Sequence, residues 1–239
     1  MRYELDHRVI DAADVGAPQH RSRAIVVATR IGSGLRWPAT VEPTTAWDAI
    51  GNLLQRQEEL PEPRGKWAGL LPSIPEGENY LWHTGRGGGE ELFGWRTRYW
   101  SFLLKLAKDR PSWTLPAQPG PATGPFHWDN RPLSVPELLR LQTFPADWTV
   151  EGSARTDHVR QIGNATPPLL AEVLGRCVVE LITGDAPREP LVMAIERSDT
   201  IPAAGQVEPI ADEYRHRVGF HADHPGSGLG PSGRGFAAT

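Results

Sequence analysis

Two short stretches of this sequence carry regular apolar patterns, and about a hundred irregular residues separate them. In the first stretch, residues 3–10 alternate loosely between apolar and polar side chains, and residues 24–28 form a β-branched apolar run. Alternation is typical of a half-buried strand, whereas a continuous apolar run predicts a strand buried on both faces. Gly16 and Pro18 lie between the two and indicate a turn. We therefore expect a strand–turn–strand unit over residues 1–30.

The second regular stretch, residues 127–190, carries the signals of helices. Ser134 is followed three residues later by Glu137, which is typical of the capped start of a helix. Farther on, apolar side chains recur every three or four residues over 169–183, and Gly184 follows them directly. This pattern predicts a return to regular helical structure.

The intervening residues 31–126 hold seven of the nine tryptophans but few periodic segments. Glycine (25) and proline (23) make up about a fifth of the chain, which favours turns and irregular structure over a helical bundle. We expect a short helix over 47–54, capped by Thr44 or Thr45, and a second element of helix or strand over 100–106.

Composition excludes several classes of protein. The net charge of −4 excludes a uniformly basic nucleic-acid coat, so any such binding has to come from a local patch. A single cysteine excludes a disulfide framework and a cysteine-based zinc finger, and we expect no metal site. No apolar run approaches the roughly 20 residues of a membrane span, so a soluble, cytoplasmic protein is expected. Residues 191–239 lose the apolar pattern and are expected to be a weakly structured or disordered tail.

Three polar clusters stand out, and each has an ordinary structural interpretation beside a functional one. Residues 19–23 place Arg21 and Arg23 on one side of an extended segment, where they could bind phosphate or a base carbonyl, or lie in a solvated turn. Residues 131–145 predict a capped packing helix with an aromatic end. Residues 160–168 form a Gly-Asn-Ala turn before Pro-Pro, suited to close approach of a ligand or to an ordinary loop–helix junction.

Taken in order, the three clusters resemble the closing motifs of the cytosine-5 DNA methyltransferase family. Residues 13–23 resemble the last eleven positions of the pattern Ala-x-Asp-Tyr-Gly-Val-Pro-Gln-x-Arg-x-Arg, and residues 131–145 resemble Arg-x-Leu-Thr-x-Arg-Glu-x-Ala-Arg-Leu-Gln-x-Phe-Pro, with Pro136 in place of an arginine. Residues 161–168 match Gln-Ile-Gly-Asn-Ala-Val-Pro-Pro, with Thr166 in place of valine. The resemblance implies a partial α/β, S-adenosylmethionine-dependent methyltransferase fold with an irregular target-recognition region.

The resemblance also implies roles for individual residues. Arg23 would donate to O2 of a flipped-out cytosine, and Arg21 would support the site or bind a phosphate. Asn164 and Ala165 would approach the methionine part of S-adenosylmethionine, and Gly163 would shape their turn. The resemblance therefore implies methyl transfer to C5 of cytosine in duplex DNA, and we expect this chain to belong to a restriction–modification system.

The target-recognition region of the family maps to residues 31–126. Basic and aromatic side chains are interleaved over 86–110, as phosphate contacts and groove entry require. A solvated basic loop over a small aromatic core remains the alternative. The family's helix over 134–142 organises this region, a structural role that would fall to Arg140 and Gln142. The predicted DNA-binding residues are Arg86, Arg96, Arg98, Lys105 and Lys108.

The family's catalytic signatures are missing from this sequence. It contains no Pro-Cys, no Glu-Asn-Val and no Phe-x-Gly-x-Gly, and its one cysteine, Cys177, lies on the apolar stripe of the predicted last helix. The chain therefore resembles a C-terminal half, inactive alone. It would be a subunit whose second polypeptide carries the cysteine, an inactive truncation, or a non-catalytic DNA-binding protein.

Overall fold

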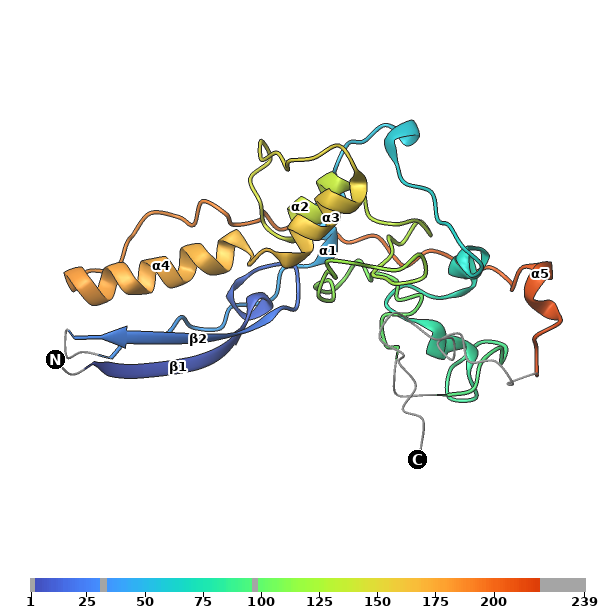
Figure 1. Ribbon diagram of the computed structural model, residues 1–239, viewed down its shortest axis with the longest axis horizontal. Coiled ribbons are helices and arrows are strands. Elements are labelled where there is room, and N and C mark those ends of the chain that lie inside the picture. The colour runs from blue at the N-terminus through green and yellow to red at the C-terminus, as the bar shows by residue number, and fades with distance from the viewer. Residues whose placement is uncertain (1–2, 31–33, 96–98, 220–239) are drawn as a thin grey trace, which may run out of the picture. The chain divides into compact units, whose positions relative to one another are not determined.

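The computed structural model describes residues 3–30, 34–95 and 99–219, which divide into two units (Figure 1). The first unit comprises residues 1–61, 107–118 and 133–203, and the second comprises residues 62–106, 119–132 and 204–239. Each unit therefore combines segments that lie far apart in the sequence, and in the second unit residues 204–219 join the middle of the chain.

The first unit begins with an antiparallel hairpin. Strand β1 (Glu4–Asp11) pairs with β2 (Ser22–Thr29) in a register that runs from Glu4 opposite Thr29 to Asp11 opposite Ser22. A 3₁₀ helix, η1 (Ala12–Val15), follows β1 and ends at Gly16, whose φ of 98° favours glycine. The strand–turn–strand prediction for the start of the chain is confirmed in these elements.

One face of the hairpin is covered and the other is open. Ile10 and Ile25 pack with Leu169 and Leu170 at the start of α4 (Pro168–Thr183), which runs alongside the strands in Figure 1. On the opposite face Leu5, Val9 and Val26 are exposed. The prediction that residues 24–28 are buried on both faces is therefore wrong, because only one face of this two-stranded sheet meets a helix within the described chain.

Local capping signals set the helices of the first unit. Thr45 and Ser134 each close a reciprocal capping box, with Asp48 and Glu137 respectively, and Gly184 ends the last helix in the left-handed region. The predicted caps at Thr45 and Ser134 and the predicted end at Gly184 are thus confirmed, whereas the helix expected over 47–54 already ends at Ile50. The helices are α1 (Ala46–Ile50), α2 (Val135–Leu141), α3 (Arg155–Asn164) and α4 (Pro168–Thr183).

Helix α3 was not expected from the sequence, which indicated only a turn over 160–168. Its buried apolar side chains are Val159 and Ile162, so the apolar stripe is too narrow to signal a helix by periodicity. As a consequence, Gly163 and Asn164 are the last residues of a helix, and the turn begins at Ala165.

The second unit is held by aromatic packing around short 3₁₀ helices. Trp67 and Tyr80 pack edge-on against Phe93 and Phe102, with ring centroids 5.2–6.1 Å apart. Such edge-to-face pairs add stability beyond the area they bury. The 3₁₀ helices here are η3 (Ala68–Ser73) and η4 (Tyr80–His83), while η2 (Gln57–Glu59) belongs to the first unit.

Residues 100–106 form neither the helix nor the strand considered from the sequence. They run as turns and isolated bridges, such as Phe102 with Thr123 and Lys105 with Phe126. Leu103 adopts a φ of 53° and is fully buried, so apolar burial rather than regular hydrogen bonding orders this segment.

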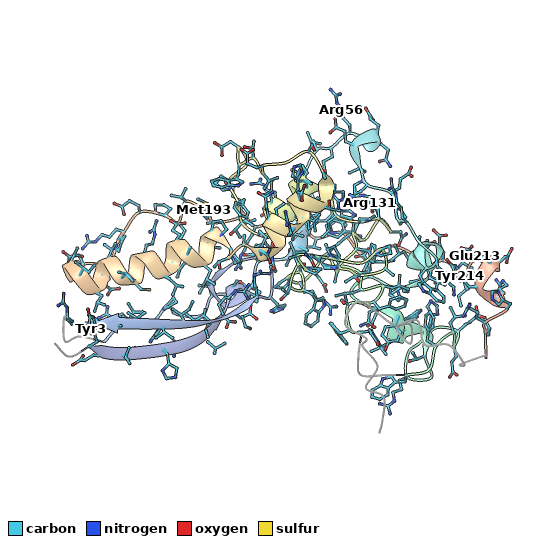
Figure 2. All side chains as sticks on the ribbon, in the orientation of Figure 1. Tyr3, Arg56, Arg131, Met193, Glu213 and Tyr214 are labelled. Atoms are coloured by element: carbon cyan, nitrogen blue, oxygen red, sulfur yellow. The ribbon has the colours of Figure 1, made fainter. Side chains whose placement is uncertain are left out.

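Part of the segment expected to be a weakly structured tail packs against the two units. Leu191 and Met193 pack on the core of the first unit, and Figure 2 labels Met193 in the irregular segment beside α4. In the second unit Ile210 and Tyr214 are buried, the latter on the short helix α5 (Asp212–Arg215). These few apolar residues order the irregular segment through contacts that the local sequence pattern does not predict. Residues 220–239 lie outside the described chain.

The capping box at α2 gives a testable stability effect. The Ser134 hydroxyl accepts from the Glu137 N–H (3.2 Å), and the Glu137 carboxylate accepts from the Ser134 N–H (2.7 Å). Ser134→Ala should lower the free energy of unfolding by about 1–2 kcal/mol, measured by urea denaturation. Ser134→Thr keeps the hydroxyl and is the matched control; equal stability of the two variants would contradict the assignment.

Candidate functional site

The turn between the two strands is organised by the carboxylate of Asp11. Its Oδ1 accepts hydrogen bonds from the backbone N–H groups of Ala13 (3.0 Å) and Arg21 (2.8 Å). Its Oδ2 accepts from the Ser22 hydroxyl (3.4 Å) and lies 3.3 Å from Nδ1 of His20. Because bonds from N–H groups to a carboxylate are strong, Asp11 fixes the backbone at position 21. Asp11 is not among the site residues predicted from the sequence, although an Asp directly before a turn is a usable signal.

Arg21 lies inside the first unit, with 4% of its surface exposed. Its Nη1 donates to the carbonyl of Leu115 (3.3 Å) and its Nη2 to the carbonyl of Gly163 (2.6 Å). Burial, together with the charge of Arg23, lowers the pKa of Arg21 to about 10, so the guanidinium stays charged at neutral pH. Of the two roles predicted for Arg21, this geometry favours support of the site over binding of a phosphate.

Arg23 lies two residues after Arg21, near the start of β2, and its environment is different. It is half-buried, its Cα pairs with that of Ile10, and its Nη1 donates to the carbonyl of Ser22 (2.8 Å). Because alternate strand residues share a face, Arg23 belongs to the same face as Ile25, which packs toward α4. Part of the side chain remains accessible, as a ligand-binding arginine requires.

At the end of α3, Gly163 is packed tightly whereas Asn164 is exposed. A Cβ built on Gly163 would lie 2.5 Å from the Ala117 Cα, so the two backbones approach closer than any side chain permits. Asn164 is exposed and Ala165 is half-buried. The Ala165 N–H donates to the carbonyl of Ile162 (3.2 Å), which fixes the backbone where the helix ends.

The three predicted clusters meet in the first unit. Arg21 of the first cluster donates to Gly163 of the third, and Gln142 of the second donates from its Nε2 to the carbonyl of Ile162 (2.6 Å). Arg140, to which the resemblance gives the same structural role as Gln142, is exposed on α2. The helix end at 162–165 is therefore the point on which motifs more than a hundred residues apart converge.

The predicted DNA-binding residues do not share one environment. Lys105 is buried in the second unit; its Nζ donates to the carbonyl of Ile74, and burial lowers its pKa to about 8. The structure thus corrects its assignment as a DNA contact. Lys108 belongs to the first unit and donates to the carbonyl of Ala203 (3.2 Å). Arg96 and Arg98 lie outside the described residues.

Arg86 is the one predicted DNA contact that lies exposed in the second unit among the residues described. Its guanidinium carbon lies 3.6 Å from the centroid of the Trp95 ring, a close cation–π contact. Trp95 and Trp100 are themselves exposed to 41% and 49%. This arrangement displays a positive charge and aromatic surface together.

The single cysteine does not resemble a nucleophile. Cys177 is buried on α4, and burial raises the pKa of its thiol above the usual value, which disfavours the thiolate. Within the described ranges, no three His, Cys, Asp or Glu side chains gather as metal ligands would. No described helix is both long and apolar enough to cross a membrane.

Comparison with known proteins gives the class to which this arrangement belongs. The family model for C-5 cytosine-specific DNA methylases matches residues 1–180. The fold is the α/β fold of S-adenosylmethionine-dependent methyltransferases, present here in part. The chain belongs to the C-5 cytosine-specific DNA methylase family.

Two curated relatives are Type II methyltransferases. M.SacI of Streptomyces achromogenes is 39% identical over 204 residues, which are 74% of this chain and 52% of the relative. M.Eco47II of Escherichia coli is 31% identical over 202 residues, or 74% of this chain and 46% of the relative. The chain therefore spans about half the length of the curated relatives it matches.

Solved structures show a weaker likeness. The Entamoeba histolytica methyltransferase EhMeth superposes with a TM-score of 0.45 at 14% identity, covering 76% of this chain and 55% of that structure. A DNA modification methyltransferase encoded within an E. coli prophage gives a TM-score of 0.48 at 20% identity, covering 75% and 61%.

The close approach at the end of α3 predicts an intolerance to any side chain there. Gly163→Ala should lower the free energy of unfolding by about 1–3 kcal/mol, because the backbone of residue 117 has to move. Gly175→Ala is the matched control: on α4 its Cβ meets nothing within 4 Å, so helix propensity should leave the protein as stable or more so. Urea denaturation of both variants measures the difference, and equal stabilities would contradict the packing described.

Proposed function

We propose that this chain is the C-terminal portion of a DNA (cytosine-5-)-methyltransferase of a restriction–modification system, acting on duplex DNA in the cytoplasm. The observation that carries the proposal is the hydrogen bond from Arg21 to Gly163. It joins the first and third motif segments inside one unit, as a shared site requires. The Type II relatives support the assignment to restriction–modification.

Arg23 is the residue of this chain that we assign to the reaction itself. A guanidinium that donates to O2 of a flipped-out cytosine stabilises the negative charge that develops on the ring when C6 is attacked. Arg23 is partly accessible, whereas Nη1 and Nη2 of Arg21 donate hydrogen bonds to backbone carbonyls. We therefore separate the pair into a substrate-binding Arg23 and a supporting Arg21.

The helix end at Gly163 is the part of the chain that fits a cofactor. Tight packing at Gly163 holds the backbone, while Asn164 is exposed and Ala165 is half-buried. These two residues would hold the methionine part of S-adenosylmethionine, which supplies the methyl group when bound. The chain provides one wall of that site, because the family's glycine-rich cofactor loop does not occur in this sequence.

The attacking thiolate has to come from elsewhere. This sequence contains no Pro-Cys, and the thiol of Cys177 is buried on α4 with a raised pKa. We propose that a complementary polypeptide carries the nucleophile and the cofactor loop. The open face of the hairpin is suited to such a partner: Leu5, Val9 and Val26 are 68–72% exposed and form an apolar surface on a sheet that has two strands within the described chain.

DNA recognition is assigned to the second unit. Arg86 and the exposed rings of Trp95 and Trp100 combine a charge for the phosphate backbone with surfaces for stacking or groove contact. Arg96 and Arg98 fall in the same stretch of sequence and stay in the proposal, whereas buried Lys105 leaves it.

The proposal is tested by complementation. The chain alone should not transfer methyl groups to DNA. Adding the product of an upstream reading frame that carries Pro-Cys, or the part of M.SacI that this chain does not match, should restore transfer from labelled S-adenosylmethionine. In that complex Arg23→Ala should lower kcat/KM by about 100-fold or more, as expected for loss of one donor to a developing charge.

Arg8→Ala is the matched control, since it removes a charge from an exposed position of the same hairpin. Its activity should equal that of the wild type. Methyl transfer by the chain alone would refute the need for a partner. Equal activities of the two variants would remove Arg23 from the site, and specific DNA binding without any restored transfer would favour a non-catalytic DNA-binding protein.

The second unit gives a separate test on DNA affinity. Arg86→Ala should weaken binding of the complemented enzyme to duplex DNA several-fold at all sequences, and should reduce the slope of log K against log salt by about one. Arg64→Ala removes the same charge from an exposed position of this unit outside residues 86–110 and should change neither value. Fluorescence anisotropy over a range of salt concentrations measures both; identical slopes for the two variants would contradict the assignment.

A further inference from the structure

Two buried glutamine side chains connect distant motifs in the first unit. Gln142, the residue that ends α2, is 0% exposed, and its Nε2 donates to the carbonyls of Ile162 (2.6 Å) and Ala165 (3.5 Å). Gln19, in the turn before β2, is also 0% exposed. A buried amide is costly unless its hydrogen bonds are made, so packing alone does not account for either residue.

Gln19 sets the direction in which Gln142 points. Its Nε2 donates to Oε1 of Gln142 (3.2 Å) and to the carbonyl of Leu141 (3.3 Å), while its own Oε1 accepts from the N–H of Leu115 (3.3 Å). Because Oε1 of Gln142 is occupied by this donor, its Nε2 is left to face the carbonyl of Ile162. The two amides therefore form a directed relay from the first motif to the third.

The relay ends at the C-terminus of α3, where side chains from other segments bind the last carbonyls. The helix has no glycine after its last turn; Ala165 leaves it with extended φ and ψ angles. The carbonyl of Ile162 accepts from Gln142 in addition to the N–H of Ala165, and the carbonyl of Gly163 accepts from Arg21. Side chains from remote elements thus fix the backbone immediately before and after the exposed Asn164.

We propose that Gln142, oriented by Gln19, is a positioning residue for the turn at Asn164 and Ala165. The resemblance assigned Gln142 to organising the recognition region, whereas its contacts are directed to this turn. The inference rests on the proposed function in one respect, that the turn contacts S-adenosylmethionine. Gln142 itself does not touch the reacting groups; it acts through the carbonyls that it holds.

Hydrogen exchange of the isolated chain tests the positioning without any methyl transfer. Gln142→Met keeps the length of the side chain and removes both ends of the relay. It should speed exchange of the amides of residues 163–166 about tenfold or more and leave the β1–β2 hairpin unchanged. Gln55→Met, the same substitution near the other end of α2, is the matched control and should leave residues 163–166 as in the wild type.

Two further variants separate the relay from general destabilisation. Gln142→Glu keeps an acceptor for Gln19 but sets a carboxylate against the carbonyl of Ile162, and should speed exchange as Gln142→Met does. Gln19→Met leaves Gln142 in place without its orienting donor and should have a smaller effect of the same sign. If Gln142→Met unfolds as a whole, Gln19→Met decides the question alone. Unchanged exchange over 163–166 in the variants that fold would overturn the inference.

The complemented enzyme tests the functional part. Gln142→Met should raise KM for S-adenosylmethionine about tenfold and leave KM for DNA unchanged, a split that a general structural defect does not produce. Equal rises of both constants, or faster exchange with no change in the cofactor KM, would overturn the positioning role. If no partner restores activity at all, the proposed function fails while the exchange result still stands.

Discussion

A buried arginine that binds backbone carbonyls holds the first unit of this protein together. Arg21 donates to the carbonyls of Leu115 and Gly163, so one guanidinium joins three segments that lie far apart in the sequence. No carboxylate accepts from it among the described residues, and burial lowers the pKa of the guanidinium to about 10, so the two carbonyl dipoles offset only part of the cost of burying the charge. Hydrogen bonds to a charged group are stronger than neutral ones, which makes this residue difficult to replace by a neutral side chain.

The second unit is stabilised differently, because it has little regular secondary structure to pair its backbone N–H and carbonyl groups. Four aromatic rings in edge-to-face contact, those of Trp67, Tyr80, Phe93 and Phe102, provide its core. Irregular loops held on such a core can differ in length and sequence without loss of the fold. This freedom suits the DNA recognition that we propose for the unit, and the exposed Arg86–Trp95 pair lies on one of these loops.

Local signals in the sequence predicted the elements that local interactions determine. Caps at Thr45 and Ser134 and the end at Gly184 depend on neighbouring residues, and all three are confirmed. Helix α3 was missed because its stability comes from remote side chains that bind its end rather than from an apolar stripe. The burial of Lys105 was missed because its partner, the carbonyl of Ile74, lies 31 residues away.

The sequence by itself determined the family, since three motifs of specific residues in a fixed order identify it before any coordinates are known. It also determined that the only cysteine does not follow a proline. Tertiary structure alone decided how the environments of the two arginines of one motif differ, with Arg21 buried and bonded to carbonyls and Arg23 left partly accessible. The physical reason is that burial and hydrogen-bond partners are properties of segments brought together from a distance, and no local pattern encodes which of two similar side chains meets them.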